Sequence, residues 1–215
     1  MITFDSDAPR SKRISFIGPD DKQTGVDYTH KLVELIRARG VTSGKIGLLT
    51  AIDQANLQRR IVAIREYLAA SEPGFVIAVT EDNRGDDQLA AERAKTMLTA
   101  HPDMAGILVV NATGSGVGTA IREMGMAGKV TVVAGGRLDP ILCAIEAGTV
   151  QASGNVNTYI EGFLGVKLAF DVVNGNLRSV PGAAAGVPLL PPVIDPGRYF
   201  IDRSNATKLL ERPCR

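Results

Sequence analysis

The sequence predicts an α/β protein whose mostly parallel sheet lies between layers of helices in a Rossmann-like arrangement. Short β-branched runs alternate with longer stretches of helical period, which is the pattern of strand–helix–strand units. In the middle of the chain these runs start about thirty residues apart, the usual length of such a unit. The 215 residues are 45% hydrophobic and 5% aromatic with no Trp, as expected for an aliphatic core.

Seven apolar runs are predicted as strands that lie side by side in one direction. They cover residues 2–4, 14–17, 45–49, 75–79, 106–110, 129–134 and 150–153. Because parallel strands end at the same edge of a sheet, polar residues after them, such as Asp5 and Asn111, are expected at one rim.

Five amphipathic stretches are predicted as helices. They cover residues 25–39, 54–70 with Asp53 as N-cap, 86–100, 115–124 and 157–174. The last of these is apolar nearly all round, so it should be heavily covered. After Gly175, Pro and Gly interrupt any period, which predicts a crossover segment, and residues 200–210 are expected to add a short strand and helix.

The charge balance argues against nucleic-acid and membrane partners. Lys and Arg number 24 against 23 Asp and Glu, so no net field attracts phosphate backbones or acidic lipids. No apolar run approaches the roughly 18 residues needed to span a bilayer, so no membrane insertion is expected.

The cysteines and histidines suggest neither a metal nor catalysis. Cys143 and Cys214 are too few for a disulfide framework and have no metal-type spacing to His30 or His101. Cys143 is predicted to be a small buried apolar side chain, and Cys214 to be exposed. No base stands beside a plausible nucleophile, so we expect no enzyme, no metal and no cofactor.

A glycine-rich stretch, Gly114-Ser115-Gly116-Val117-Gly118, follows a predicted strand and opens a helix. It is superficially similar to a dinucleotide fingerprint, but Thr119 stands where the third Gly is required. A tight turn is favoured over nucleotide binding, although a helix N-terminus can hold an anion.

Five segments carry a further pattern: residues 2–9 (ITFDSDAP), 12–18 (KRISFIG), 99–107 (TAHPDMAGI, a turn from a helix end into a strand), 145–152 (IEAGTVQA) and 159–167. They resemble segments of the ribose-type sugar-binding proteins of ABC importers, which have the type I periplasmic binding protein fold. The resemblance is collinear over roughly residues 2 to 200. Members of this family have two lobes joined by three crossing segments, with sugar in the cleft between them.

The resemblance implies a division of the chain and a function. Residues 1–12 would be the hinge-entering strand and crossing segment of the first lobe, 13–155 a C-terminal-lobe-like domain, and 156–215 a long helix, a Pro/Gly-rich crossover and a tail. The first half of the N-terminal lobe would be absent, and surfaces left open by its absence suggest a possible homodimer.

The implied function is non-catalytic binding of a monosaccharide or polyol, followed by docking on an ABC permease. The family is periplasmic, although this chain shows no signal peptide. The alternative is the effector-binding domain of a LacI-type transcription regulator, which shares the fold.

The resemblance also supplies candidate ligand-binding residues: Asp5, Asn56, Arg60, Asn111, Arg137 and Asn155. Asp5 could instead form a turn, and Asn56 and Arg60 could instead lie on a solvated helix face. Asn111 is the strongest candidate because its amide both donates and accepts hydrogen bonds.

Two departures from the family pattern affect the other candidates. Arg137 ends a stretch, Ala134-Gly135-Gly136-Arg137, where the family has Gly-Phe-Asp. Either Asn155 or Asn157 could replace the family's Gln. The ligand is therefore expected to be unusual, or binding to have been lost.

Overall fold

The computed structural model describes residues 1–177 and 188–214, and it confirms an α/β fold with mostly parallel strands. The strands are β1 (Ile2–Phe4), β2 (Ser15–Ile17), β3 (Gly44–Thr50), β4 (Phe75–Asp82), β5 (Met104–Val109), β6 (Thr131–Gly135), β7 (Ala152–Val156), β8 (Val193–Ile194) and β9 (Arg198–Asp202). The helices are α1 (Asp21–Arg37), α2 (Ala55–Ser71), α3 (Asp87–Ala100), α4 (Gly114–Glu123), α5 (Asp139–Glu146), α6 (Thr158–Val173) and the short 3-10 helix η2 (Ala206–Leu209).

The chain forms two compact units. The smaller unit comprises residues 1–20 and 156–199, and the larger unit comprises residues 21–155 and 200–215. The chain therefore passes from one unit to the other three times. The segments 1–12, 13–155 and 156–215 that the sequence suggests as domains stay a prediction, and part of the expected crossover, residues 178–187, lies outside the described residues.

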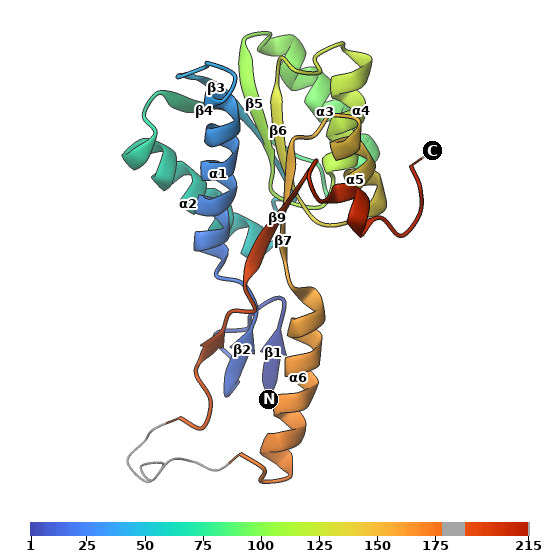
Figure 1. Cartoon of the computed structure of the whole chain (residues 1–215). Coiled ribbons are helices and arrows are strands. Elements are labelled where there is room, and N and C mark those ends of the chain that lie inside the picture. The colour runs from blue at the N-terminus through green and yellow to red at the C-terminus, as the bar shows by residue number, and fades with distance from the viewer. Residues whose placement is uncertain (178–187, 215) are drawn as a thin grey trace. The chain divides into compact units, whose positions relative to one another are not determined.

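The larger unit is a three-layer sandwich around a six-stranded sheet of order β4-β3-β5-β6-β7-β9. Figure 1 shows α1 and α2 on one face of this sheet and α3, α4 and α5 on the other. Successive residues of a strand point to opposite faces. Accordingly Ile107 and Val109 pack in the core under α3 and α4, whereas Leu108 and Val110 pack in the core under α1 and α2. Both faces are covered, which explains why the strand is apolar throughout.

The glycines of the stretch 114–118 allow α4 to approach its neighbours closely. A Cβ on Gly116 would lie 2.0 Å from the backbone oxygen of Asp87 at the start of α3. A Cβ on Gly114 would lie 2.5 Å from the Ala134 side chain of β6, and one on Gly118 would lie 2.9 Å from the Ala144 side chain of α5. Packing of α4 against α3, β6 and α5 therefore accounts for these three glycines.

We expect Gly116→Ala to lower the free energy of unfolding by about 2 kcal/mol, because the methyl group forces the α3 and α4 backbones apart. Gly162→Ala in α6 is the matched control, since its Cβ would meet nothing within 4 Å. That substitution should stabilise the protein by about 0.5 to 1 kcal/mol. Urea unfolding of both variants tests the prediction, which is contradicted if the two substitutions have the same effect.

The smaller unit has a three-stranded parallel sheet of order β1-β2-β8, with β1 at one edge. Helix α6 packs beside β1 (Figure 1), and a Cβ on Gly165 would lie 3.3 Å from the Phe4 ring. Directly after β1, Asp5 has a φ of 62°, so this exposed residue forms a turn that few side chains favour.

The structure corrects four details of the sequence prediction. The strands form two sheets, so Asp5 and Asn111 follow strands of different sheets. Helix α2 begins after Gln54, and no side chain caps it, so Asp53 is not its N-cap. Helix α5 was not predicted, because eight residues starting with Asp139-Pro140 are too short to show a helical period. The expectation that the long helix is heavily covered is wrong for the described residues, since five large apolar side chains of α6 are exposed.

The two cysteines form a disulfide, Cys143–Cys214, within the larger unit. Cys143 lies half-buried on α5, so the prediction of a buried apolar side chain is wrong, whereas Cys214 is exposed as expected. The C-terminal tail is also held by Asp139, whose carboxylate accepts hydrogen bonds from the backbone amides of Glu211 and Arg212, each at 3.1 Å. A pocket of about 770 Å³ lies between α4, α5 and this tail.

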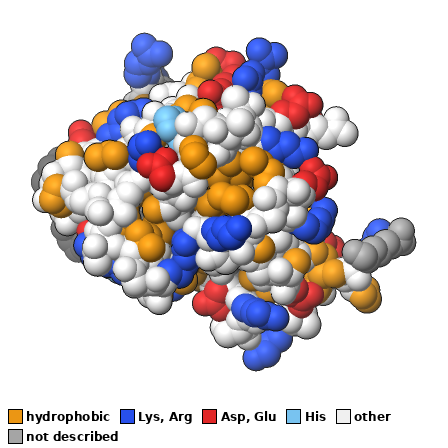
Figure 2. Space-filling view, turned by 90° about the horizontal axis from the view of Figure 1, so that it is seen from above, with side chains coloured by type: hydrophobic (Ala, Val, Ile, Leu, Met, Phe, Trp, Pro, Cys, Tyr) orange, Lys and Arg blue, Asp and Glu red, His pale blue; other side chains and the backbone are white. Residues whose placement is uncertain are grey.

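The surface shows mixed charge. On the face seen in Figure 2, Lys and Arg side chains alternate with Asp and Glu around an apolar area, so no field of one sign forms there. Within residues 1–177 and 188–214, no helix combines the length and the hydropathy that a bilayer crossing requires.

Candidate ligand-binding site

The carboxyl ends of the parallel strands in the larger unit carry a row of polar side chains. Thr50 ends β3, Asn83 follows β4, Asn111 lies just beyond β5, and Asn155 lies near the end of β7. In an open parallel sheet, ligands bind outside these strand ends. We define this row as the polar rim.

Asn83, Asn111 and Thr113 form a closed hydrogen-bond network at the centre of the polar rim. The Asn83 Nδ2 atom donates to Asn111 Oδ1 at 3.1 Å and to Thr113 Oγ1 at 2.8 Å, and Asn111 Nδ2 donates to Asn83 Oδ1 at 2.7 Å. Thr113 Oγ1 in turn donates to Asn111 Oδ1 at 2.7 Å. Asn83 is fully buried and Asn111 is half-buried. The network therefore fixes the Asn111 amide and leaves its second Nδ2 proton for another acceptor.

Two buried polar atoms of the polar rim have no hydrogen-bond partner among the described residues. They are Thr50 Oγ1 and Asn155 Nδ2. A buried polar group without a partner costs about 1 to 3 kcal/mol, so such groups are uncommon unless something else binds them. Thr50 Oγ1 can both accept and donate a hydrogen bond, and Asn155 Nδ2 can donate one. A ligand hydroxyl group can pair with either atom, because it also donates and accepts.

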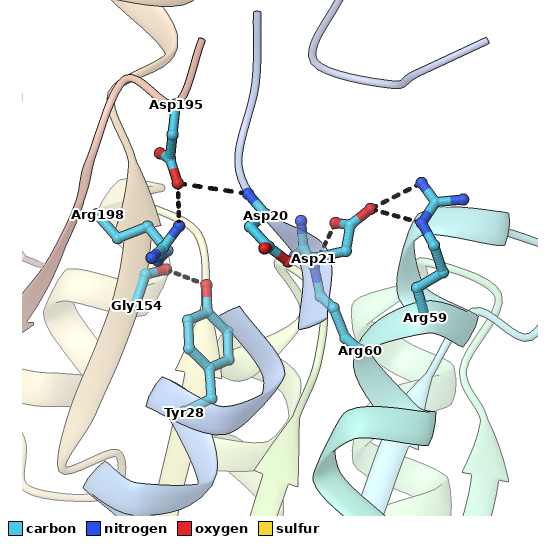
Figure 3. Close-up of polar contacts among 8 residues, drawn as sticks. All are labelled: Asp20, Asp21, Tyr28, Arg59, Arg60, Gly154, Asp195 and Arg198. Carbon is cyan, nitrogen blue, oxygen red and sulfur yellow. Dashed lines mark hydrogen bonds and ion pairs between the residues drawn. The ribbon is translucent and has the colours of Figure 1, made fainter. Parts of the chain in front are cut away.

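Asp21, at the start of α1, is held by two arginines of α2 (Figure 3). Its Oδ2 atom accepts from Arg59 Nε at 3.0 Å and Nη2 at 2.7 Å, and its Oδ1 atom accepts from Arg60 Nε at 3.0 Å. The Asp21 and Arg60 side chains are 10% and 13% exposed. The Nε bond holds the planar Arg60 guanidinium in one orientation, and its Nη groups make no hydrogen bond with the described residues.

The side chain of Tyr28 in α1 packs against Gly154 of β7 and Phe200 of β9. Its hydroxyl donates to the Gly154 carbonyl oxygen at 2.7 Å (Figure 3), and its ring lies where a Gly154 side chain would be, with Cε1 2.0 Å from the added Cβ. The ring also packs against Phe200 of β9 at a centroid distance of 5.9 Å. Only glycine therefore fits at position 154, one residue before Asn155.

A separate polar contact lies in the smaller unit. The Asp195 carboxylate accepts from Arg198 Nη1 at 2.6 Å and from the Asp20 backbone amide at 3.5 Å (Figure 3). It also accepts from the Gly197 amide at 2.9 Å. Burial raises the pKa of Asp195, but the Gly197 amide and the Arg198 guanidinium outweigh this and lower it overall, so the residue stays charged.

The start of α4 is already occupied by a carboxylate of this chain. Asp87 accepts from Ser115 Oγ at 2.9 Å and from the Gly116 amide at 3.1 Å. A phosphate would have to displace this side chain to reach the same amide. The arrangement thus favours a packing role for the glycine-rich stretch over nucleotide binding.

The six sequence-predicted ligand residues occupy different environments. Asn111 lies in the network, and Arg60 and the half-buried Asn56 lie in the first two turns of α2. Arg137 is exposed after β6 and donates through Nη2 to the Leu209 carbonyl at 3.2 Å. Asn155 lies at the rim, whereas Asp5 belongs to the smaller unit.

Of the two asparagines that could replace the family's Gln, Asn157 has a structural role. Its Oδ1 atom accepts from the Ile160 amide at 3.3 Å and caps α6. Asn155 has an unused donor instead. The assignment of ligand residues stays a prediction.

Sequence reasoning missed Asn83, Thr113 and Asp21. The predicted strand ended at Val79, whereas β4 continues to Asp82, so Asn83 was not recognised as a residue that follows a strand. The turn residues Asn83, Arg84 and Gly85 were the available signal, and Arg84 and Gly85 have φ values of 51° and 73°.

Comparison with known proteins places the chain in a family. The model of the periplasmic binding protein domain matches residues 1–177. A sugar-binding protein of a sugar ABC transporter from Bacillus halodurans is 25% identical with a TM-score of 0.86, over 97% of this chain and 70% of that protein. A solute-binding protein from Burkholderia graminis, solved with D-arabinose, is 26% identical with a TM-score of 0.83, over 96% and 68% of the two chains.

AraP, an arabinose-binding protein from Geobacillus stearothermophilus, is 23% identical and shares the fold, with a TM-score of 0.85 over 97% of this chain and 70% of AraP. No curated protein sequence matches the chain significantly. An α/β fold with parallel sheets, two units joined by three crossings and a polar rim at the strand ends defines the class of solute-binding proteins. This chain belongs to the periplasmic binding protein family.

Proposed function

We propose that this chain is the sugar- or polyol-binding component of an ABC importer and that Asn111 contacts the ligand. The observation that carries the proposal is the polar rim, where a fixed, half-buried amide lies between strand ends that hold two unpaired polar atoms. Similar proteins include a sugar-binding protein and one solved with D-arabinose, which supports a neutral, polyhydroxylated ligand.

The chemistry of the rim fits hydroxyl groups better than charged groups. Asn111 and Asn155 offer amide donors, Thr50 offers a hydroxyl, and each ligand hydroxyl can both donate and accept. Arg60 adds a rigid fork that can reach neighbouring hydroxyls. We propose Asn56, Arg137 and Asp5 as further contacts on the strength of the family resemblance.

Binding of this kind makes and breaks no bond, and the family is non-enzymatic in general. We propose the same for this chain: ligand contacts shift an open–closed equilibrium, and the closed form docks on a membrane permease. The family is periplasmic, and the disulfide Cys143–Cys214 suits an oxidising compartment such as the periplasm. The LacI-type effector domain is not favoured, since the similar structures described above are transporter proteins.

Calorimetric titration of the chain with pentoses, hexoses and polyols tests this function. We expect one class to release heat with a 1:1 stoichiometry, and Asn111→Ala to weaken binding about tenfold, the worth of one hydrogen bond of about 1.4 kcal/mol. Asn174→Ala, an exposed change in the smaller unit, is the control and should leave the affinity unchanged. Absence of heat with all three classes, or equal affinities of Asn111→Ala and the unmodified chain, contradicts the proposal.

A further inference from the structure

Residues 209–214 of the larger unit follow the β6–α5 loop and then α5. The short helix η2 packs against α5 (Figure 1). From its last residue onward, three attachments succeed one another: the hydrogen bond from Arg137, the two amide hydrogen bonds to Asp139 and the disulfide to Cys143. We define residues 209–214 as the C-terminal strap.

Helix α5 depends on contacts with the rest of the unit for its position. It has eight residues and no side chain caps its start, whereas an isolated helix in water needs about 12 to 15 residues. One face is held by the core, where Ile141, Leu142 and Ile145 are buried. The strap is attached at Asp139 and Cys143, which lie on a different face at 100° per residue. The strap therefore provides support that the core does not.

The end of β6 is joined to the polar rim on both sides, because β6 lies between β5 and β7 in the sheet. The Gly135 amide donates to the Asn111 carbonyl oxygen at 3.2 Å. The Gly136 amide donates to the Gly154 carbonyl oxygen at 3.0 Å. Asn155, whose Nδ2 atom has no partner among the described residues, follows Gly154 directly. A shift of the β6–α5 loop would therefore disturb the strand ends that carry both asparagines.

Gly136 fixes the point where the loop leaves the sheet. Its φ of 95° is one that side chains disfavour, and a Cβ there would lie 2.6 Å from the Ala112 side chain. The Ser153 hydroxyl donates to the Gly136 carbonyl oxygen at 2.5 Å. The loop is thus held by the sheet at its start and by the strap at its end.

The disulfide of the strap is accessible to a reductant. Cys214 is exposed and Cys143 is half-buried, and both line the pocket of about 770 Å³ between α4, α5 and the strap. Leu210 packs against the core, whereas the residues after it are attached through Asp139 and the disulfide. Cleavage of the disulfide therefore leaves residues 211–214 with surface hydrogen bonds alone, which open readily in water.

We propose that the C-terminal strap fixes the β6–α5 loop at the polar rim and that reduction of the Cys143–Cys214 disulfide releases the loop. One thiolate of a dithiol attacks Cys214 Sγ, and Cys143 leaves as a thiolate and is protonated. The second thiol of the reductant then displaces Cys214. Two electrons pass to the two cysteines, and the dithiol becomes a disulfide. A consequence, which rests on the function proposed above, is that the oxidised chain binds its ligand more tightly than the reduced chain.

Hydrogen exchange of the 215-residue chain without ligand, with and without dithiothreitol, tests the strap. The amides of Gly136, Ile141 and Leu142 donate hydrogen bonds within and beside the loop. On reduction we expect their exchange to become about tenfold faster, and to increase more than exchange in α2, because local opening precedes global unfolding. Cys214→Ser should exchange like the reduced chain and should not respond to the reductant.

Leu68→Ala separates loss of the strap from loss of stability. Leu68 is 4% exposed and lines a groove with Phe75, the first residue of β4, so it lies near the end of the sheet opposite the rim. The substitution leaves a cavity that destabilises the unit. It should not speed exchange in the β6–α5 loop more than in α2. Circular dichroism shows whether each variant is folded.

Calorimetry tests the link to binding with D-arabinose, or with the pentose, hexose or polyol that gives heat in the titration above. Reduction and Cys214→Ser should each weaken binding about fivefold, a typical coupling between two sites, whereas Leu68→Ala should leave the affinity unchanged. Equal affinities of the oxidised and reduced chains overturn this link. Loop exchange that is unchanged on reduction, or that rises no more than exchange in α2, overturns the strap itself. If no carbohydrate gives heat, the function proposed above fails and the link fails with it, whereas the exchange measurement still decides on the strap.

Discussion

Replacement of Cys143 by Ser is expected to lower the free energy of unfolding by about 4 kcal/mol. The Cys143–Cys214 disulfide closes a loop with a sequence separation of 71 residues, and a crosslink of that span restricts the unfolded chain by roughly this amount at room temperature. Residues up to Leu210 are also held by core packing, but Glu211 and Arg212, just before Cys214, are held by two amide hydrogen bonds to Asp139.

The same loss should follow from reduction of the unmodified chain. Denaturant unfolding with and without a thiol reductant measures it, and the reductant should have no effect on the Cys143→Ser variant. Cys214→Ser should reproduce Cys143→Ser, since either change removes the same crosslink. Equal stability of the reduced and oxidised unmodified chain contradicts the prediction.

Asn83→Ala should cost about 3 kcal/mol of unfolding free energy, the second largest effect. Asn83 is fully buried, and its removal leaves Asn111 Nδ2 without the acceptor that Asn83 supplies at 2.7 Å. The buried Thr113 hydroxyl also loses the donor that Asn83 supplies at 2.8 Å. Each buried group left unpaired costs about 1 to 3 kcal/mol. The Asn111 amide also loses its anchor, so ligand affinity should fall together with stability.

The control for Asn83→Ala is Asn56→Ala, because Asn56 is half-buried on α2 and its side chain makes no hydrogen bond with the described residues. It should change stability by less than about 0.5 kcal/mol. Thermal unfolding of the two variants side by side measures the difference. A cost for Asn83→Ala no larger than that for Asn56→Ala would show that the network does not stabilise the strand ends.

The sequence was sufficient to predict the strand–helix order of the larger unit. Buried parallel strands such as β5 are apolar on both faces, so each appears in the sequence as a continuous apolar run. These runs alternate with segments whose apolar residues recur at helical spacing, and the two patterns are easy to tell apart. Helix α5 gave no such signal because of its length, and the start of α2 was misplaced by the Asp53-Gln54 pair. The division of the strands into two sheets was not predictable, since each strand has the same composition whichever sheet it joins.

The site was only partly predictable for a related reason. Asn111 follows a long apolar run, so its place at a strand end could be inferred from the sequence. Its partner Asn83 follows a strand whose last residues, Glu81 and Asp82, are polar and obscure where the strand ends. The pairing of Asp21 with Arg59 and Arg60 depends on the packing of α1 against α2, which no local pattern encodes.

The Cys143–Cys214 bond has a further consequence for the smaller unit. Residues 156–199, which contribute α6 and β8, lie inside the covalent ring that this bond closes. A protease that cuts once within this stretch leaves two fragments that still migrate as one species on a denaturing gel without reductant. Only reduction separates them, so a nicked preparation looks intact unless the thiols are released first.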